Sequence, residues 1–265
     1  MVSEATVEIP ERAAAAATGP ILSLRGIWKS FGSKAVFRGL DLDIERGEIL
    51  ALLGSSGCGK SVLLKLIIGL MSVDRGTILW DGMHVELASS KELAAVRRRV
   101  GMVFQGAALF DSLSVAENVA YGLNVQGSRG MKSADVKERV AWALSAVGLG
   151  ETGELMPSEL SGGMRKRVGV ARTIALRPEV VLYDEPTTGL DPINSARIGD
   201  LIAQLRQELN VTSVVVTHDL TLASHIADRI ALLHEGKVIA IGPVDVINAS
   251  TDPIVREFLD GRREM

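Results

Sequence analysis

The stretch GSSGCGKS at residues 54–61 constrains the fold of this chain more than any other part of its sequence. It follows the apolar run EILALLG and precedes KSVLLKLIIGL, so a strand, a glycine-rich turn and a helix succeed one another. Three glycines in the turn allow backbone N–H groups to converge on a phosphate. A glycine-rich turn that matches the pattern by chance is the alternative, but the flanking strand and helix favour a phosphate-binding loop in an α/β fold.

The residues of this loop have expected roles toward a nucleotide. Lys60 is expected to reach the outer phosphates, and the Ser61 hydroxyl is expected to ligate Mg²⁺, which prefers oxygen ligands. Nucleotide contacts are expected from Gly54, Ser55, Ser56, Gly57, Cys58, Gly59, Lys60, Ser61 and Val62. Cys58 is the single cysteine and is expected to fill a variable loop position without a catalytic part, although its place near a helix N-terminus favours a lowered pKa. We predict that alkylation of this thiol inactivates the protein and that bound nucleotide protects it.

Apolar runs alternate with helical patterns along the rest of the chain. Four runs that end at polar residues are predicted to be buried strands of a mainly parallel sheet: residues 48–54, 100–104, 180–185 and 212–218. Residues 21–48 and TILWDG at 77–82 have the pattern of antiparallel strands. Residues 107–160 contain at least two helical patterns and no strand pattern, so they are predicted to be a helical insertion.

Helix starts are marked by short-range pairs of residues. Two pairs have the spacing of capping boxes: Ser89 with Glu92, and Ser114 with Glu117. Asp191 and Asp252 each precede a proline, so both are predicted to be N-caps.

Two carboxylates end the buried run VVLYDE. Asp184 is expected to hold the magnesium shell, and Glu185 to polarise the water that attacks the terminal phosphate. An isolated Asp-Glu pair is usually part of a solvated loop, but the phosphate loop in the same chain favours the catalytic interpretation. His218 ends the run VVVTH and is expected to contact the γ-phosphate. The other histidines are expected to be surface or packing residues: His84, His225 and His234.

The composition limits the classes of protein to which the chain can belong. Its 265 residues are 47% apolar and 23% charged, which is typical of a globular protein. The formal net charge of −3 and the few aromatic residues argue against nucleic acid as a partner. No stretch approaches the roughly 20 apolar residues that span a bilayer. The acidic segment 1–20 lacks the features of a secretion signal and is expected to be a disordered tail.

An ordered set of motifs gives the chain a family resemblance: KSFG, GSSGCGKS, VFQ, LSGGMRKR, VVLYDE, TGLD and VTH. Over about residues 21–245 the chain resembles the ATP-binding-cassette ATPases. The resemblance implies an α/β P-loop NTPase core with a mainly parallel sheet, an antiparallel β subdomain and a helical insertion. It implies an ATPase domain over residues 21–250, with a helical subdomain at about 107–165 and a C-terminal extension at 251–265.

The resemblance also implies ligands and an activity. ATP and Mg²⁺ would bind, and ATP hydrolysis to ADP and phosphate would drive transmembrane transport. Phe31 would stack on the adenine, in preference to Trp28. Gln105 would contact the magnesium ion and the attacking water, and would couple the core to the helical insertion. Asp184 would be the other protein ligand of the metal beside Ser61 and Gln105.

The motif LSGG has an implied role at a second copy of the chain. In this family two copies pack head to tail, and the LSGG turn of one covers the phosphate loop of the other. Ser161, Gly162 and Gly163 would therefore complete the partner's nucleotide site, and Asp191 would lie at the dimer contact. Donors divided between two copies would make hydrolysis conditional on closure of the dimer.

Longer stretches narrow the resemblance. GKSVLLKLIIGL, FQGAALFDSLSVAENV, LSGGMRKRVGVAR and STDPIVREFLDG are similar to the ATPase of MCE-type lipid transporters, especially the Mla phospholipid system. This resemblance implies a homodimer on the cytoplasmic face of the bacterial inner membrane, held there by a dimer of an integral membrane permease. It also implies a periplasmic MCE-domain protein and a STAS-domain subunit as partners, and phospholipids as cargo.

Some residues depart from the commonest family pattern, and some alternatives stay open. Met164 replaces a glutamine, Val62 a threonine and Asp111 a proline, but none of these changes removes a catalytic group. The alternatives are an importer or exporter of another solute, a soluble cassette ATPase acting on DNA or ribosomes, and an inactive nucleotide-binding regulator. The basic stretches MRKRV at 164–168 and RRR at 97–99 are interpreted as solvated helix faces, with lipid contact as the alternative for MRKRV. Residues 251–265 are interpreted as an ordinary amphipathic terminal helix, with a brace for the dimer or a partner as the alternative hypothesis.

Overall fold

The computed structural model describes residues 19–126 and 131–260. The tail predicted for residues 1–20 lies outside this part of the chain apart from its last two residues, as do residues 261–265 of the C-terminal extension. No helix in the described ranges is long and apolar enough to cross a membrane.

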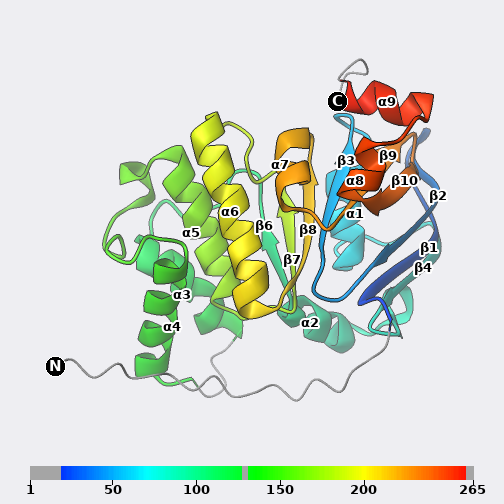
Figure 1. Cartoon of the computed structure of the whole chain (residues 1–265). Coiled ribbons are helices and arrows are strands. Elements are labelled where there is room, and N and C mark those ends of the chain that lie inside the picture. Colours follow the sequence, from blue (N-terminus) through cyan, green and yellow to red (C-terminus); the bar gives the residue numbers. More distant parts are fainter. Residues whose placement is uncertain (1–18, 127–130, 261–265) are drawn as a thin grey trace.

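Two sheets form the frame of the molecule (Figure 1). The larger sheet has the strand order β10-β9-β3-β8-β7-β6, and all neighbours are parallel except β10 with β9. Its strands are β3 (Ile49–Gly54), β6 (Val100–Val103), β7 (Val180–Asp184), β8 (Thr212–Thr217), β9 (Arg229–His234) and β10 (Lys237–Pro243). The four strands predicted for this sheet are confirmed, whereas the sequence analysis did not include β9 and β10.

The smaller sheet is antiparallel and has the order β2-β1-β4-β5. Its strands are β1 (Leu22–Phe31), β2 (Lys34–Ile44), β4 (Arg75–Trp80) and β5 (Met83–His84). The antiparallel pattern predicted for residues 21–48 and 77–82 is thus confirmed. Asp81 and Gly82 join β4 to β5 with positive φ angles of 52° and 80°, which fit the tight turn of a two-residue hairpin.

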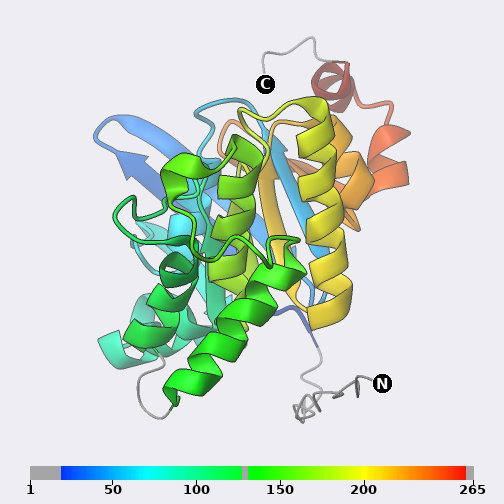
Figure 2. The ribbon, with the colours of Figure 1, turned by 90° about the vertical axis from the view of Figure 1, so that its left-hand side faces the viewer.

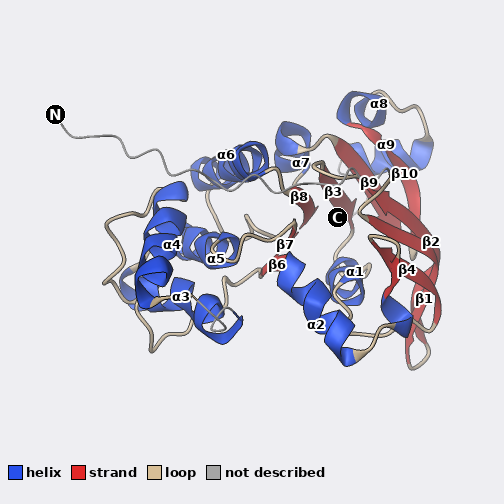
Figure 3. Ribbon diagram, turned by 90° about the horizontal axis from the view of Figure 1, so that it is seen from below, coloured by secondary structure: helices blue, strands red, loops and turns tan. Residues whose placement is uncertain are grey.

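Helices cover both faces of the larger sheet (Figure 3). They are α1 (Lys60–Ile67), α2 (Ser90–Arg99), α3 (Val115–Gln126), α4 (Ser133–Ala146), α5 (Gly162–Ile174), α6 (Pro192–Leu209), α7 (Leu220–Ile226), α8 (Val244–Asn248) and α9 (Pro253–Leu259), with 3₁₀ turns at Val85–Leu87 and Pro157–Glu159. Figure 2 shows α3 and α4 together at one end of the molecule. The predicted insertion therefore contains the expected helices, and no strand occurs in its described residues.

The predicted helix starts are also observed. Ser89 and Glu92 form a reciprocal capping box at α2, and Ser114 and Glu117 bond each other's backbone N–H groups in the same way before α3. Two aspartates cap helices that have proline in the first turn: Asp191 at α6 and Asp252 at α9. Side chains that satisfy the free N–H groups of a helix start typically contribute about 1 kcal/mol each.

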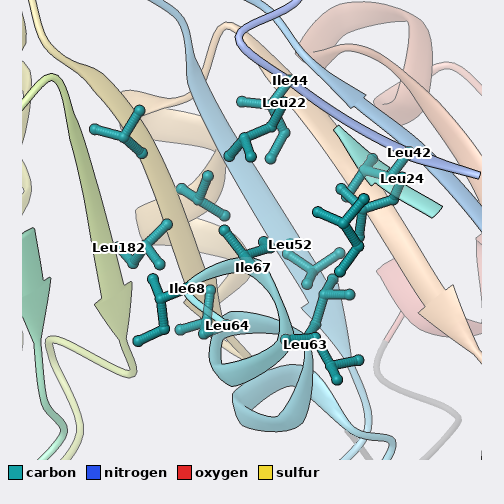
Figure 4. Close-up of a cluster of buried hydrophobic side chains, with 14 of the residues drawn as sticks. Leu22, Leu24, Leu42, Ile44, Leu52, Leu63, Leu64, Ile67, Ile68 and Leu182 are labelled. Carbon is teal, nitrogen blue, oxygen red and sulfur yellow. The ribbon is translucent and has the colours of Figure 1, made fainter. Parts of the chain in front are cut away.

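Alternate residues of β3 pack into different cores, because successive side chains of a strand point to opposite faces. Leu50 and Leu52 belong to a cluster between the two sheets that includes α1 (Figure 4). Ala51 and Leu53 belong to a cluster with α7, α8 and α9. A third cluster contains buried side chains of helices α3, α4, α5 and α6 and of the opposite face of β7 and β8. With both faces buried, β3 fixes the position of the loop that follows it.

Candidate functional site

A cavity of about 630 Å³ opens at the carboxyl end of β3. Its lining comes from the loop 54–61, the segment after β6, the end of β7, the end of β8 and the antiparallel sheet. The residues are Phe31, Lys34, Val36, Ser56, Gly57, Gly59, Lys60, Ser61, Val62, Gln105, Glu185, Thr188 and His218. Parallel strands deliver their carboxyl ends to one edge, which is where ligands bind in such sheets. Residues far apart in sequence therefore meet here.

The loop 54–61 requires glycine at two positions for different reasons. A Cβ on Gly54 would lie 2.6 Å from the Leu233 carbonyl oxygen, so no side chain fits beside β9. Gly59 has a φ of +108° and precedes α1, where a Cβ would lie 2.4 Å from Cγ1 of Val36. Gly54 thus lets the chain pass close to β9, and the left-handed Gly59 lets it turn sharply into α1, whose first residues Lys60 and Ser61 line the cavity.

Lys60 is held against the loop that it follows. Its ammonium group donates to the backbone oxygens of Gly54 at 2.7 Å and Ser55 at 3.2 Å. Only 7% of the side chain is exposed, and Oε1 of Glu185 lies 3.8 Å from its Nζ. The buried Lys60 ammonium group supplies positive charge at the cavity. Binding of a polyphosphate requires such charge in a site that excludes bulk water.

Ser61 and Asp184 form a pair of oxygen donors below the cavity. The Ser61 hydroxyl donates to Oδ1 of Asp184 at 2.8 Å, which joins the first turn of α1 to the last residue of β7. A hydroxyl oxygen and a carboxylate oxygen at this separation are ligands that Mg²⁺ accepts, and phosphate oxygens and water would complete its octahedral coordination. The residues present therefore fit a magnesium ion.

Glu185 occupies a left-handed backbone conformation with φ of 49°. Its carboxylate lies 2.8 Å from Nδ1 of His218 and accepts a bond from the Thr188 hydroxyl at 3.3 Å. The side chain is 13% exposed and that of His218 is 52% exposed, so the pair lies at the cavity surface. A carboxylate oriented by a histidine, a hydroxyl and the ammonium of Lys60 is a candidate general base for a water molecule.

Phe31 and Trp28 differ in their position relative to the cavity. Both rings are exposed, at 45% and 43%, but only Phe31 lines the cavity. The Lys29 ammonium lies 5.5 Å from the Phe31 ring centroid. The arrangement agrees with the preference for Phe31 as the stacking residue.

The LSGG turn does not line this cavity. Ser161 is the N-cap of α5, and its hydroxyl accepts a bond from the Met164 N–H at 3.2 Å. Ser161 and Gly162 are exposed, and Gly163 lies against Asn194. Asp191 is likewise outside the cavity and caps α6, where hydrogen bonds from Asn194 lower its pKa. The structure thus brings together the residues expected from one copy and leaves the expected dimer residues on the outside.

The comparison with known families decides the identity of this fold. The family model described as ABC transporter matches residues 37–188, which include the phosphate loop, the LSGG turn and the acidic end of β7. The chain belongs to the ABC transporter family. It is the ATP-binding, ATP-hydrolysing subunit that couples energy to transport in this family. The expectation of a P-loop ATPase core with an antiparallel subdomain and a helical insertion is confirmed.

Curated relatives carry two kinds of transport name. The "Intermembrane phospholipid transport system ATP-binding protein MlaF" of Escherichia coli K12 is 41% identical over 91% of this chain and 89% of its own length. The "Probable ribonucleotide transport ATP-binding protein mkl" of Mycobacterium leprae is 40% identical over 92% of this chain and 70% of its own length.

Two solved ABC cassettes have the same fold. One structure is titled "Dimeric structure of a post-hydrolysis state of the ATP-binding cassette MJ0796 bound to ADP and Pi"; it is 31% identical, has a TM-score of 0.76 and covers 84% of this chain and 98% of that chain. The other, cbiO1 from Clostridium perfringens, is 30% identical, with a TM-score of 0.81 over 91% and 95% of the two chains.

Cys58 in this ABC transporter ATPase differs from the expectation. Burial raises the pKa of its thiol, although the charge of Lys60 acts in the opposite direction. The expected lowering of this pKa was wrong, because burial of the thiol against the hydrophobic core outweighs the charge of Lys60 and the backbone N–H groups of Cys58 and Lys60. Cys58 and Ser55 line a neighbouring cavity of about 270 Å³ and are not part of the lining of the larger one.

The expectation of solvated faces for the two basic stretches holds only in part, since Arg97, Arg98 and Arg165 are exposed but other residues are not. Lys166 is buried, with 8% exposed. Arg97 donates to the carbonyl oxygens of Ile68 and Gly69, and Arg99 pairs with Asp81 and Glu179. Arg97 and Lys166 donate to backbone oxygens of other elements, which charge patterns alone do not reveal.

Other site residues were missed in the sequence. Lys34, Val36 and Thr188 line the cavity; Thr188 is the first residue of the TGLD motif, whereas Lys34 and Val36 belong to no distinctive run. Thr188 follows the acidic strand end by a few residues, and this proximity was the available signal. The expectation for the remaining histidines is confirmed: His84 pairs with Glu86, His225 with Asp200, and His234 packs on Phe258.

Proposed function

We propose that this chain powers a phospholipid transporter that moves lipids between the inner and outer membranes and so maintains lipid asymmetry. The observation that carries the proposal is the match to MlaF, which is 41% identical over nearly the full length of both chains. The relative named for ribonucleotide transport is equally similar, but this chain spans only 70% of it. Transport of another solute, ribonucleotides included, is therefore the second candidate.

Partners follow from this proposal. The ATPase would work at the cytoplasmic face of the bacterial inner membrane, bound to a permease dimer, with a periplasmic MCE-domain protein and a STAS-domain subunit in the complex. The rings of Phe110 and Tyr121, 4.5 Å apart at their centroids, are 41% and 44% exposed at the start of the helical insertion. An exposed aromatic pair is typical of a protein contact site, and this supports docking of a permease there.

The cargo is tested on the native complex. A tag on the chain, gentle solubilisation and mass spectrometry of the purified complex are expected to identify a permease, an MCE-domain protein, a STAS-domain protein and bound phospholipid. Reconstituted ATPase activity is then measured with phospholipid vesicles and with ribonucleotides. Stimulation by ribonucleotides alone, or a complex without an MCE-domain protein, contradicts the proposal.

The permease contact has its own test. Tyr121→Ala is expected to reduce the amount of co-purifying permease at least several-fold, since exposed aromatic residues contribute strongly to interfaces. Val246→Ala is the matched control, because Val246 is 57% exposed on α8. Equal permease recovery with both variants contradicts this assignment.

The nucleotide site is proposed to be shared between two copies of the chain. Ser161 uses its hydroxyl to bond one N–H of the first turn of α5, and a helix start has further N–H groups without a partner in the helix. Ser161 and Gly162 are exposed, so an anion on another molecule can approach them. The dimeric state of the similar cassette MJ0796 supports a head-to-tail pair in which Asp191 lies at the contact.

Mixed dimers test this division. Lys60→Ala disables one phosphate loop, and Ser161→Arg disables one LSGG turn. With the two changes on different chains, one complete site remains if the sites are shared, so about half of the activity is expected. With both changes on one chain, no complete site remains. The opposite result, activity only when both changes are on one chain, means that each copy completes its own site.

Magnesium is proposed to bind through Ser61, Asp184 and Gln105. The bound ion would neutralise charge on the outer phosphates. Removing the hydroxyl with Ser61→Ala is expected to raise the Mg²⁺ concentration needed for half-maximal ATPase activity at least about tenfold, the cost of one charge-assisted contact. Ser56→Ala, in the same loop, is the control. An unchanged Mg²⁺ requirement in Ser61→Ala contradicts the ligand assignment.

A further inference from the structure

Helix α5 presents a buried face to the segment that contains Gln105. Lys166 is 8% exposed. Its ammonium group donates to the backbone oxygen of Gln105 at 2.5 Å and to that of Glu185 at 3.3 Å. One side chain thus joins α5 to both segments that carry the residues expected to contact the attacking water.

Further contacts hold the same segment one and two turns along α5. The Arg172 guanidinium donates to the backbone oxygens of Ala107 at 2.8 Å and Ala108 at 2.7 Å. A Cβ on Gly169 would lie 3.4 Å from Cβ of Ala107, so the helix and the segment are in close contact. Lys166, Gly169 and Arg172 are spaced by three residues, which places them along one side of a helix.

The segment that these residues hold is conformationally unfavourable by itself. Ala107 and Ala108 have φ values of 61° and 47°, in the left-handed region. Glu185 lies in the same region with φ of 49°. Each such residue costs on the order of 1 kcal/mol or more, and persists because its surroundings hold it. Charge-assisted hydrogen bonds to carbonyl oxygens are strong enough to supply this restraint.

We propose that Lys166 is a positioning residue for ATP hydrolysis, which holds the backbones of Gln105 and Glu185 in register with the LSGG end of α5. The proposal rests on the catalytic roles proposed above for those two residues. A buried cation that only satisfies nearby carbonyl oxygens is the alternative. Loss of the ammonium group distinguishes the two roles. If Lys166 positions the catalytic segments, its loss lowers turnover selectively; if Lys166 has a structural role alone, its loss lowers stability and nucleotide binding together.

Two features of the site support the positioning role. The Lys166 ammonium group bonds to the backbone oxygens of Gln105 and Glu185. It therefore fixes the backbone positions of these residues and leaves their side-chain amide and carboxylate groups free to act. It also stands on the second turn of α5, beyond the turn formed by Ser161–Gly163. A displacement of α5 would therefore reach both carbonyl oxygens through one side chain.

The test replaces Lys166 in the full-length ATPase. Lys166→Met keeps the length of the side chain and removes its donors, Lys166→Arg keeps a cationic donor, and Lys137→Met makes the same change at an exposed lysine of α4. We expect Lys166→Met to lower kcat about 10–100-fold, because a misplacement of about 1 Å costs this much. KM and the Kd of a fluorescent ATP analogue are expected to stay within about threefold, with kcat partly restored in Lys166→Arg.

Two outcomes overturn the proposal. One is a kcat of Lys166→Met within about twofold of Lys137→Met. The other is a parallel loss of kcat, nucleotide affinity and Tm that Lys166→Arg does not reverse, which means a structural role alone. If Lys166→Met does not fold, Lys166→Gln is measured with the same criteria, since its amide is a donor of shorter reach.

A double variant separates this inference from the role of Glu185. If Lys166 acts through Glu185, Lys166→Met is expected to reduce the residual turnover of Glu185→Gln by less than about threefold, because positioning a group that is already disabled has little effect. A full further decrease contradicts positioning of Glu185. Wild-type turnover in Glu185→Gln alone would instead overturn the proposed general base, whatever Lys166 does.

Discussion

Gly101 in β6 packs directly against Thr173 of α5, and a methyl group added there tests the packing of α5. A Cβ on Gly101 would lie 2.3 Å from Cγ2 of Thr173 and 3.2 Å from Cγ of Pro178. Overpacking of this kind costs about 1–3 kcal/mol. The lower entropy of the unfolded chain offsets about 0.4–1 kcal/mol of that, because the φ of Gly101 is not positive.

The net loss expected for Gly101→Ala is therefore about 0.5–2 kcal/mol, or a Tm lower by roughly 1–8 °C. Thr173→Ser removes the clashing methyl group and keeps the hydroxyl that donates to the Gly169 oxygen at 2.9 Å. By itself this change is expected to cost about 1 kcal/mol for a lost buried methyl. In the double variant the two costs should not add, since the methyl group added by Gly101→Ala fills the cavity left by Thr173→Ser.

Urea unfolding of the two single variants and the double variant measures the coupling free energy. We expect the double variant to be more stable than the sum of the single effects by about 1–2 kcal/mol. Additivity within about 0.5 kcal/mol would mean that α5 moves away from β6 without strain, and it would refute this account of the contact. An unchanged Tm in Gly101→Ala would do the same.

Further predictions concern the nucleotide site and the acid stability of the fold. Glu185→Gln is expected to slow phosphate release about 10²–10⁴-fold with ATP affinity unchanged or higher, since it removes a general base and a negative charge; turnover within tenfold of wild type contradicts this role. Phe31→Ala is expected to weaken ATP binding by about 1–3 kcal/mol while Trp28→Ala does not, measured with a fluorescent analogue, and equal effects contradict the stacking assignment. Hydrogen bonds from Arg99 lower the pKa of Asp81 below its usual value, although burial acts against them; their stabilisation is present above about pH 4 and is lost as the pH falls further. Asp81→Asn is therefore expected to lose about 1 kcal/mol of unfolding free energy at pH 7, and the difference from wild type should shrink below pH 4; a difference that grows in acid contradicts it.

The strands and the phosphate loop could be predicted from the sequence because their signals are local. An apolar run such as β3 is buried on both faces, and glycines with positive φ mark the turn that follows it. For Ser61 and Asp184 the sequence predicted a role for each residue but not the contact between them, because the two residues lie 123 positions apart. Strands β9 and β10 were missed, although β9 has the buried pattern of a strand.

Long cationic side chains were the least predictable part of the site. In sequence, Lys166 belongs to a basic stretch on a helix, and such stretches usually face water. In the structure, the direction of α5 points Lys166 and Arg172 at carbonyl oxygens of a segment more than 60 residues earlier in the chain. Which carbonyl oxygens lack a partner depends on the tertiary path of that segment, including its left-handed alanines. No periodicity or motif in the sequence encodes this path.

The position of α5 also gives a physical reason for the LSGG turn, which is proposed to face a phosphate of a second copy and lies far from the loop 54–61 in sequence. The loop 54–61 begins α1 under the cavity of the same chain, whereas the turn at residues 161–163 begins α5 outside that cavity. Between its exposed start and its buried face, α5 runs past Gln105 and Glu185 and contacts their backbones through Lys166. A phosphate bound to the start of α5 would restrain the same helix that orients the catalytic residues of its own chain. In the proposed head-to-tail pair, occupancy of one nucleotide site would therefore affect the other through α5, and the contacts of Lys166, Gly169 and Arg172 would set the strength of that coupling.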